Sequence, residues 1–384
     1  MTTRITVFRI AIVALSAALL VGSAGAQQDS DNSSADRISP AEDSDGVVET
    51  EQAAAPPEEV PARAPATSGG GHGRCQDRCD ACGGCASCAC TGSHWFDDCC
   101  QPLWTVNAGA VFLERSRPSS SPILQSITTG HPLLTGGNFG FNFAAGPDVQ
   151  LIRRLRNGKG LEIRYFAVDG GNSNEAGTIP PNTLLSTIPK LTVAPGTAWD
   201  APYRSQLYSA EINLRRASPR FDWLTWLAGF RWVELQEGLD LRLARGVDHG
   251  DISSRTNNHL YGGQIGANMN LWDNGGPFRV NCWAKSGLFG NLASNNFALV
   301  QPGMQINVAD HASQAAFVGD IAANASYQLT DHVAIRAGYQ LLWIQGVAIA
   351  SDQIVATDML TNNGINTTGG AFYHGALTSI NFTW

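Results

Sequence analysis

The sequence predicts an all-β fold, a transmembrane antiparallel β-barrel of about ten strands. Three observations indicate it. Long stretches carry apolar residues at every second position, short and long links alternate between them, and aromatic residues gather near both ends of the stretches. We expect four parts: a signal peptide at 1–26, a disordered tether rich in acidic residues, Pro, Ala and Ser at 27–73, a Cys-rich periplasmic segment at 74–102, and an outer-membrane β-barrel at 103–384.

The N-terminal residues have the pattern of an export signal. Arg4 and Arg9 precede an apolar run that ends near Val21, and Ala24-Gly25-Ala26 follows. The run is too short to span a bilayer, so we expect a secretory signal cleaved after Ala26. An N-terminal membrane anchor is the alternative. An exported barrel belongs in the bacterial outer membrane, and we expect both mature termini in the periplasm.

Charge is distributed unevenly along the chain. The formal net charge is -8, from 25 Lys and Arg against 33 Asp and Glu. Residues 1–103 hold 6 basic and 14 acidic side chains, which leaves 19 of each for 104–384. Binding to nucleic acid needs clustered Lys and Arg, so no nucleic-acid partner is expected.

A cysteine-rich segment precedes the first strand. Its eight disulfide candidates are Cys75, Cys79, Cys82, Cys85, Cys88, Cys90, Cys99 and Cys100. The C-x2-C spacings from Cys79 to Cys88 come close to an iron–sulfur pattern but lack its wider last spacing and its Pro. In the oxidising periplasm an even number of cysteines favours a disulfide knot, so we expect no metal and no cofactor.

Two alternatives to the knot remain open. The cysteines could cross-link to another chain or to another envelope protein, or they could bind zinc with help from His72 or His94. A knot would make the non-reduced 75–100 peptide eight hydrogens lighter than its reduced form, which mass analysis of protein from the native envelope would detect. Cys282 has the parity of Val280 and Ala284, and we expect it to face lipid as a free thiol.

From Trp104 onward the hydrophobic period is two. In "LEIRYFAV" (161–168), Leu161 and Ile163 alternate with Glu162 and Arg164. Alternation of this kind predicts strands with one apolar face. The ten expected strands lie near 103–115, 138–154, 159–168, 205–217, 221–238, 257–272, 278–290, 314–329, 332–345 and 370–384.

The links between these stretches alternate in length. The short ones are the turn-forming sequences "RNGK", "SPR", "DNGGP" and "TDH". The long ones span 116–137, 169–204, 239–256, 291–313 and 346–369. Short periplasmic turns, long outer loops and an even strand number are typical of an outer-membrane barrel. A soluble β-sandwich is the alternative fold for the same strands.

The aromatic residues predict two interfacial girdles. Their main members are Trp104, Trp226, Trp272, Trp343 and Trp384. Tryptophan at both membrane–water interfaces is typical of transmembrane barrels. The chain closes on Trp384, at the end of the alternating stretch "FYHGALTSINFTW". We expect this last strand to pair with the first one, so that the barrel has no open edge.

Charged residues at the strand positions that alternate with the apolar ones are predicted to face the lumen. The expected lumen charge network contains Glu162, Arg164, Glu211, Arg215, Arg231, Arg279, Lys285, Asp320 and Arg336. Eight strands leave room only for side chains, so ten should enclose a narrow or plugged lumen. Unpaired charges would be costly there, and we expect these side chains to pair across it. Simple packing of polar side chains and a selective permeation path are both compatible with this network.

Several stretches resemble the family of bacterial outer-membrane proteins known as beta-barrel porin-7. They are "GKGLEIRYFAVDG", "LYSAEINLRR" followed by "LAGFRWVELQEGL", "NNHLYGGQIGANMNLW", "AKSGLFGN", "DHVAIRAGYQLLWIQGVAIASDQI" and "TTGGAFYHGALTSINFTW". The resemblance covers about 104–384 and implies an outer-membrane barrel whose transport role is unproven. It supplies no catalytic residues. The terminal aromatic strand also resembles the signal that the barrel assembly machinery recognises.

We therefore expect an outer-membrane barrel with a narrow or plugged lumen and a porin-like or structural envelope role. Its partners would be outer-membrane lipid, the assembly machinery and, through the Cys-rich segment, other envelope proteins. A surface-binding protein that acts through long outer loops is the alternative. A barrel-embedded hydrolase is less favoured, and we expect no enzyme, because the sequence has none of the common hydrolase motifs. The histidines are scattered at His131, His259, His311, His332 and His374.

Overall fold

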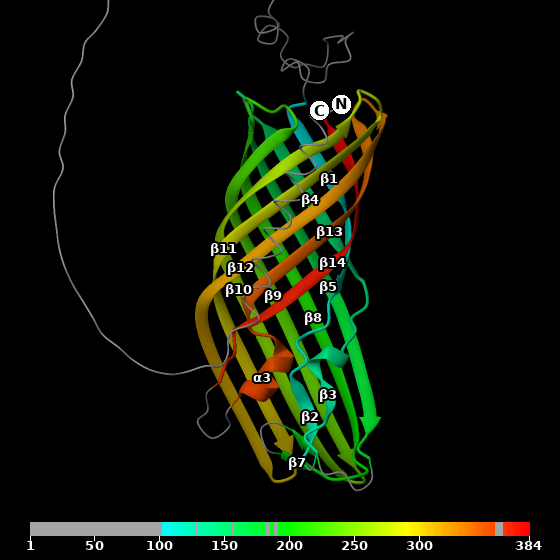
Figure 1. Ribbon diagram of the computed structural model, residues 1–384, viewed down its shortest axis with the longest axis vertical. Coiled ribbons are helices and arrows are strands. Elements are labelled where there is room, and N and C mark those ends of the chain that lie inside the picture. The colour runs from blue at the N-terminus through cyan, green and yellow to red at the C-terminus, as the bar shows by residue number, and fades with distance from the viewer. Residues whose placement is uncertain (1–101, 128, 156, 181–184, 188–190, 358–363) are drawn as a thin grey trace, which may run out of the picture. The chain divides into compact units, whose positions relative to one another are not determined.

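The computed structural model describes residues 102–384 except 128, 156, 181–184, 188–190 and 358–363. Ten of its strands form a closed barrel in the order β1-β14-β13-β12-β11-β10-β9-β8-β5-β4, with every neighbouring pair antiparallel (Figure 1). Their bounds are β1 Trp104–Arg115, β4 Ala144–Arg154, β5 Lys159–Thr178, β8 Ala198–Ala217, β9 Leu224–Arg245, β10 Asp248–Asp273, β11 Phe278–Gln301, β12 Met304–Thr330, β13 Val333–Val347 and β14 Gly369–Thr383.

The last strand closes the barrel against the first. Thr105 pairs with Thr383, and the backbone nitrogen of Trp104 lies 2.9 Å from the carbonyl oxygen of Trp384. The closed ladder satisfies the backbone polar groups of both strands, which a membrane-spanning sheet requires. We call the end of the barrel that holds Trp104 and Trp384 the near end and the opposite end the far end.

The remaining elements belong to the links at the far end. The strands β2 (Pro122–Ser126), β3 (Pro132–Thr135), β6 (Leu185–Thr187) and β7 (Leu191–Val193) form a second sheet in the order β3-β2-β6-β7. A 3-10 turn, η3 (Gly136–Asn138), follows β3, and a short helix, α3 (Ala350–Ala356), precedes β14. None of the helices in the described part of the chain has the length and apolar composition of a transmembrane helix.

Two of the predicted long loops are wrong. In place of 239–256, β9 and β10 run on and meet at a two-residue turn, Gly246-Val247. In place of 291–313, β11 and β12 meet at Pro302-Gly303, where Gly303 has a φ of 78°. Proline followed by glycine in this conformation suits a tight hairpin turn.

Other strand boundaries also differ from the prediction. Residues 169–178 and 198–204 extend β5 and β8 into the predicted loop 169–204. At the other boundary, β4 begins at Ala144, six residues later than predicted, and the 3-10 turn η3 at Gly136–Asn138 precedes it. The far half of the molecule therefore contains more strand and less loop than the alternation of link lengths indicates.

Along the extended strands the pattern of apolar and polar side chains reverses. On β9 the outward side chains are apolar at Trp226 and Phe230, which are 56% and 49% exposed, and polar from Glu234 onward. The inward side chains change in the opposite sense, from Arg231 to the fully buried Leu239. The membrane half is thus apolar outside and polar inside, and the far half is the reverse.

The barrel is closed by ten strands only in its near half. Beyond Phe166, β5 pairs with β8 but not with β4, and beyond Phe317, β12 pairs with β11 but not with β13. The far half is therefore an open sheet of β5, β8, β9, β10, β11 and β12. The open side is where the links 116–143 and 348–368 leave the barrel.

Candidate functional site

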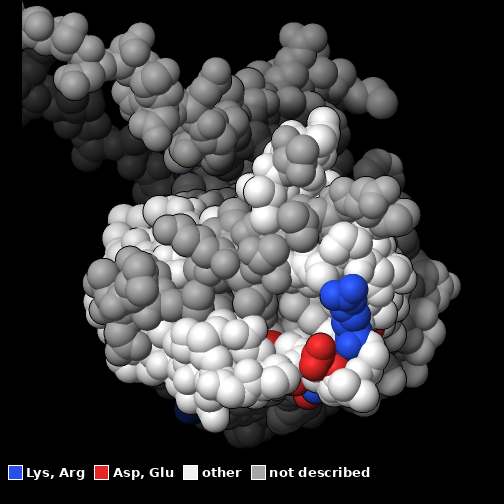
Figure 2. Space-filling model, turned by 90° about the horizontal axis from the view of Figure 1, so that it is seen from below, with Lys and Arg blue, Asp and Glu red and all other residues white. Residues whose placement is uncertain are grey.

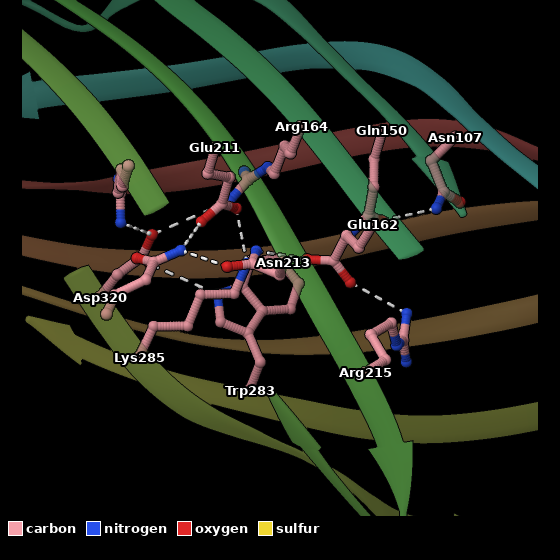
Figure 3. A network of polar contacts seen from close by, with 12 residues as sticks. Asn107, Gln150, Glu162, Arg164, Glu211, Asn213, Arg215, Trp283, Lys285 and Asp320 are labelled. Carbon is pink, nitrogen blue, oxygen red and sulfur yellow. Dashed lines mark hydrogen bonds and ion pairs between the residues drawn. The ribbon is translucent and has the colours of Figure 1, made fainter. Parts of the chain in front are cut away.

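A charged network crosses the lumen in the near half (Figure 3). Lys285 on β11 lies at its centre, with Nζ 3.0 Å from Glu162 Oε1 on β5 and 2.6 Å from Glu211 Oε1 on β8. All three side chains are almost fully buried. Since β11 and β5 are separated by three strands of the barrel order, these contacts join opposite walls.

Asp320 on β12 forms a second centre of the network. It accepts hydrogen bonds from Arg231 Nη1 at 3.2 Å, Trp283 Nε1 at 3.3 Å and Gln340 Nε2 at 2.9 Å. Arg164 Nη1 lies 3.8 Å from the same carboxylate. In the barrel order β5, which holds Arg164, is five strands from β12, so this pair spans the full width of the lumen.

Arg164 and Glu211 each have further hydrogen-bond partners in the network. The Arg164 guanidinium donates to both oxygens of Asp148, at 2.8 and 3.0 Å. Gln264 Nε2 donates to Glu211 Oε2 at 2.5 Å and to Asn213 Oδ1 at 2.8 Å. Buried charges are tolerated when they are paired and hydrogen-bonded in this way.

The structure brings most of the predicted lumen charges together. Glu162, Arg164, Glu211, Arg215, Arg231, Lys285 and Asp320 belong to one network, which Arg215 joins through a 2.9 Å contact with Glu162. Arg279 lies at the near end instead, 3.3 Å from Asp273. Arg336 contacts the ring of Trp283, 5.0 Å from its centroid.

Sequence reasoning missed Asp148 and Trp283. Asp148 alternates with Val149 on β4, so its parity was a usable signal. Trp283 was not among the predicted girdle residues, and it lies in the lumen with three cationic groups, of Arg164, Lys285 and Arg336, within 6 Å of its ring centroid. Nothing local in the sequence distinguishes an inward tryptophan of this kind from an interfacial one.

A second buried cluster closes the lumen farther along. Arg115 Nε lies 2.6 Å from Glu237 Oε1, and the Tyr203 hydroxyl donates to Glu237 Oε2 at 2.7 Å. The backbone nitrogen of Ala350 donates to the same oxygen at 3.2 Å. Tyr203 lies beyond the apolar outer band. Burial and then Glu237 raise the pKa of its phenol well above the usual value, so it remains a neutral donor.

The link residues 116–143 and α3 fill the far half, and we call them the far-end plug. Ile123 and Leu124 of β2, both fully buried, pack with Leu239 of the wall and Ile354 of α3 in one apolar cluster. Ser119 Oγ donates a hydrogen bond to Asp352 and so ties the first link to α3. In the described part of the far-end surface, charged residues occupy only a small area (Figure 2).

A groove opens at the free edge of β5, beside the plug. It has a volume of about 740 Å³ and is bordered by Arg117, Asn142, Asn172, Arg204 and Gln206. Its wall is irregular because the β5–β8 register shifts between Val168 and Gly171. Most of its lining residues have an amide, hydroxyl or charged group that can hydrogen-bond to a polar ligand.

The remaining predicted residues occupy different parts of the molecule. Trp226, Trp272 and Trp384 are 56%, 50% and 58% exposed, whereas Trp104 and Trp343 are half-buried. Cys282 is a free, half-buried thiol on the outward face of β11 with Val280 and Ala284. Ala26 and the cysteines of 75–100 lie outside the described residues. Within the described ones, no group of three or more His, Cys, Asp or Glu is placed to hold a metal ion.

Comparisons with known proteins do not place the chain in a family. No family model and no curated protein matches the chain, so the resemblance to the beta-barrel porin-7 family stays a prediction. The outer membrane protease OmpT of Escherichia coli is 11% identical, with a TM-score of 0.40 over 73% of this chain and 96% of that one.

Two further solved structures are similar at lower scores. The toluene transporter TodX of Pseudomonas putida gives 10% identity and a TM-score of 0.31 over 73% of this chain and 90% of its own. CarO2 of Acinetobacter baumannii gives 12% identity and a TM-score of 0.22 over 73% of this chain and 99% of its own. At such identities none of these likenesses indicates a function. The geometry of the chain itself, a closed ladder with an apolar outward band, makes it an antiparallel transmembrane β-barrel.

Proposed function

We propose that this chain is a bacterial outer-membrane barrel with a plugged lumen, and that its role is structural or ligand-binding rather than open diffusion. The observation that carries the proposal is that the lumen is blocked at two levels. The network around Lys285 and Asp320 joins opposite walls, and the apolar far-end plug fills the lumen beyond it. Water and solutes would have to displace both, and the buried charges cannot separate without a large desolvation cost.

The topology proposal rests on the near end. It holds both barrel termini, and the long links 116–143 and 348–368 leave the opposite end, so we place the near end in the periplasm and the far end outside the cell. Outer-membrane lipid would cover the apolar band, and the assembly machinery would recognise β14. The Cys-rich segment before β1 would serve as an anchor or as a contact to other envelope proteins.

Recording in planar lipid bilayers tests the closed lumen. The purified, refolded chain is expected to give no steady single-channel conductance at voltages where a general porin, inserted in parallel, conducts. Insertion is verified independently by the heat-dependent shift of the folded protein on a gel. Steady, uniform current steps from inserted protein would contradict the plugged barrel and favour a porin-like role.

The groove beside β5 favours surface binding as a second candidate function. Asn142, Asn172 and Arg204 are exposed there and offer both donors and acceptors, a combination that suits a hydroxyl-rich ligand such as a saccharide. We expect labelled protein to bind selected glycans on an array of bacterial surface saccharides. Binding should weaken about tenfold in Asn172→Ala, the loss of one to two hydrogen bonds.

The matched control for the groove is Asn296→Ala. Asn296 is exposed on β11 and is not part of the groove lining, so its loss should leave glycan binding unchanged. Equal loss in both variants, or no glycan bound by the wild-type chain, would remove the saccharide proposal. We do not propose a hydrolase role; peptide or phospholipid hydrolysis by intact cells, lost on changing one histidine, would contradict this.

A further inference from the structure

Arg336 differs from the other lumen cations in lacking a carboxylate partner. It lies on β13 between Ser326 of β12 and Ser379 of β14, and its Nε is buried without a hydrogen-bond acceptor. Within the described chain no carboxylate oxygen comes within the 4.0 Å of an ion pair. Its guanidinium packs on the face of Trp283, 5.0 Å from the ring centroid. A cation–π contact does not replace a counter-ion in a poorly hydrated site.

The charge balance of the network leaves one cation uncompensated. Its cations are Arg164, Arg215, Arg231, Lys285 and Arg336, and its carboxylates are Asp148, Glu162, Glu211 and Asp320. The four carboxylates are all engaged by the first four cations, through contacts of 2.6 to 3.8 Å. The excess positive charge therefore lies at Arg336.

A cavity of about 210 Å³ opens beside this guanidinium on the near-end side of the network. Its lining is mainly amide, and we call it the vestibule; it includes Asn107, Gln150, Asn268, Asn270, Asn281 and Asn381. Three of these amides are already oriented, because Asn381 Nδ2 donates to Asn107 Oδ1 at 2.7 Å and Asn107 Nδ2 donates to Gln150 Oε1 at 2.8 Å. Arg215, Lys285 and one carboxylate, Glu162, also border the vestibule. With Arg336 its lining holds three cations against this one carboxylate, so its electrostatic potential favours an anion.

We propose that the vestibule binds a small oxyanion, a carboxylate or a phosphate, with Arg336 as its anchor. The guanidinium offers a planar fork of donors that matches such a group, and the vestibule amides supply further donors around it. The volume admits a small organic acid or inorganic phosphate but not a nucleotide or a folded peptide. The site depends on the charge of the near half and not on whether the barrel conducts, so it goes beyond the proposed function.

Titration of the full chain, folded in detergent, tests the site with two probes. Inorganic phosphate and acetate are titrated separately at constant ionic strength, with chloride as the reference anion, and binding is followed calorimetrically. We expect saturable binding of at least one oxyanion and none of chloride at equal concentration. Binding of phosphate alone or of acetate alone would show which of the two oxyanion groups the vestibule accepts. No saturable oxyanion binding, or equal binding of chloride, would overturn the proposal.

Variants at two arginines locate the site. Arg336→Gln is expected to weaken oxyanion binding by about tenfold or more, because it removes a charge-assisted bidentate contact. Arg153→Gln is the matched control, since Arg153 also stacks on a tryptophan, Trp104, but faces outward. The oxyanion affinity of Arg153→Gln should equal that of the wild-type chain. Wild-type affinity in Arg336→Gln would overturn the assignment.

A second substitution keeps the test decisive if Arg336→Gln does not fold. Arg336→Lys retains the charge but loses the planar fork, so acetate affinity should still fall several-fold. A merely structural role for Arg336 would lower the stability of this variant without changing its affinity. Unchanged affinity for both oxyanions in Arg336→Lys would therefore count against the site.

Discussion

Replacing Lys285 with methionine is expected to lower the free energy of unfolding by about 3–5 kcal/mol, the usual cost of removing one partner from a buried ion pair. Lys285 Nζ contacts both Glu162 and Glu211, and the substitution leaves both carboxylates buried with less compensation. Arg215 still neutralises Glu162 at 2.9 Å, so the loss falls mainly on Glu211. Denaturant unfolding in lipid vesicles, followed by tryptophan fluorescence, measures the change.

Two companion variants separate charge from packing in this prediction. Lys285→Met combined with Glu211→Gln should recover much of the lost stability, because the second change removes the uncompensated charge. Arg242→Gln breaks the exposed Arg242–Asp200 pair, whose side chains are 60% and 41% exposed, and should cost no more than about 0.5 kcal/mol. An ordinary surface substitution changes the free energy of unfolding by roughly 1 kcal/mol or less. If the free energy of unfolding of Lys285→Met lay within about 1 kcal/mol of the wild-type value, the network would not be a main source of the barrel's stability.

Replacing Ile123 with aspartate is expected to release the far-end plug while the barrel stays folded. Ile123 is fully buried in the apolar cluster with Leu124, Leu239 and Ile354, and an unpaired carboxylate there costs several kcal/mol. The link 116–143 is joined to the barrel wall by this packing more than by strand pairing, so it should undock before the ten-stranded ladder opens. Limited proteolysis with a nonspecific protease, mapped by mass, should show new cuts within 116–143.

The control for plug release is Ile127→Asp in the same link. Ile127 is 54% exposed, so a charge there should leave the cleavage pattern unchanged. The heat-dependent gel shift should be retained in both variants, which shows that the barrel persists. Identical cleavage in Ile123→Asp and the wild type would mean that β2 is not held by its apolar packing.

The near half of the barrel could be predicted from sequence because its rule is local. In a membrane strand the outward side chains meet lipid and the inward ones meet a polar lumen, so parity alone separates Ile163 from Arg164. The same rule assigned Lys285, Glu211 and Asp320 to the lumen. It failed beyond Glu234 on β9, where the outward face meets water and the inward face packs on the plug.

The residues that form the groove and the plug were harder to predict from the sequence than the strands. The groove beside β5 depends on a register shift at Val168 and on the early end of β4, neither of which leaves a clear mark in the sequence. The plug depends on Ile123 and Leu134, which read as ordinary loop residues in a short, irregular stretch. Their burial follows from the wall that surrounds them.

Local sequence patterns are enough to predict that the chain forms strands, where most of them begin and end in the near half, and which charges face inward. These properties follow from side-chain alternation and turn chemistry over a few residues. Which charges meet follows from barrel closure, which brings Arg164 of β5 and Asp320 of β12 together across the lumen. Barrel closure also leaves Arg336 without a carboxylate partner, because that depends on every neighbour across the lumen and on none along the chain.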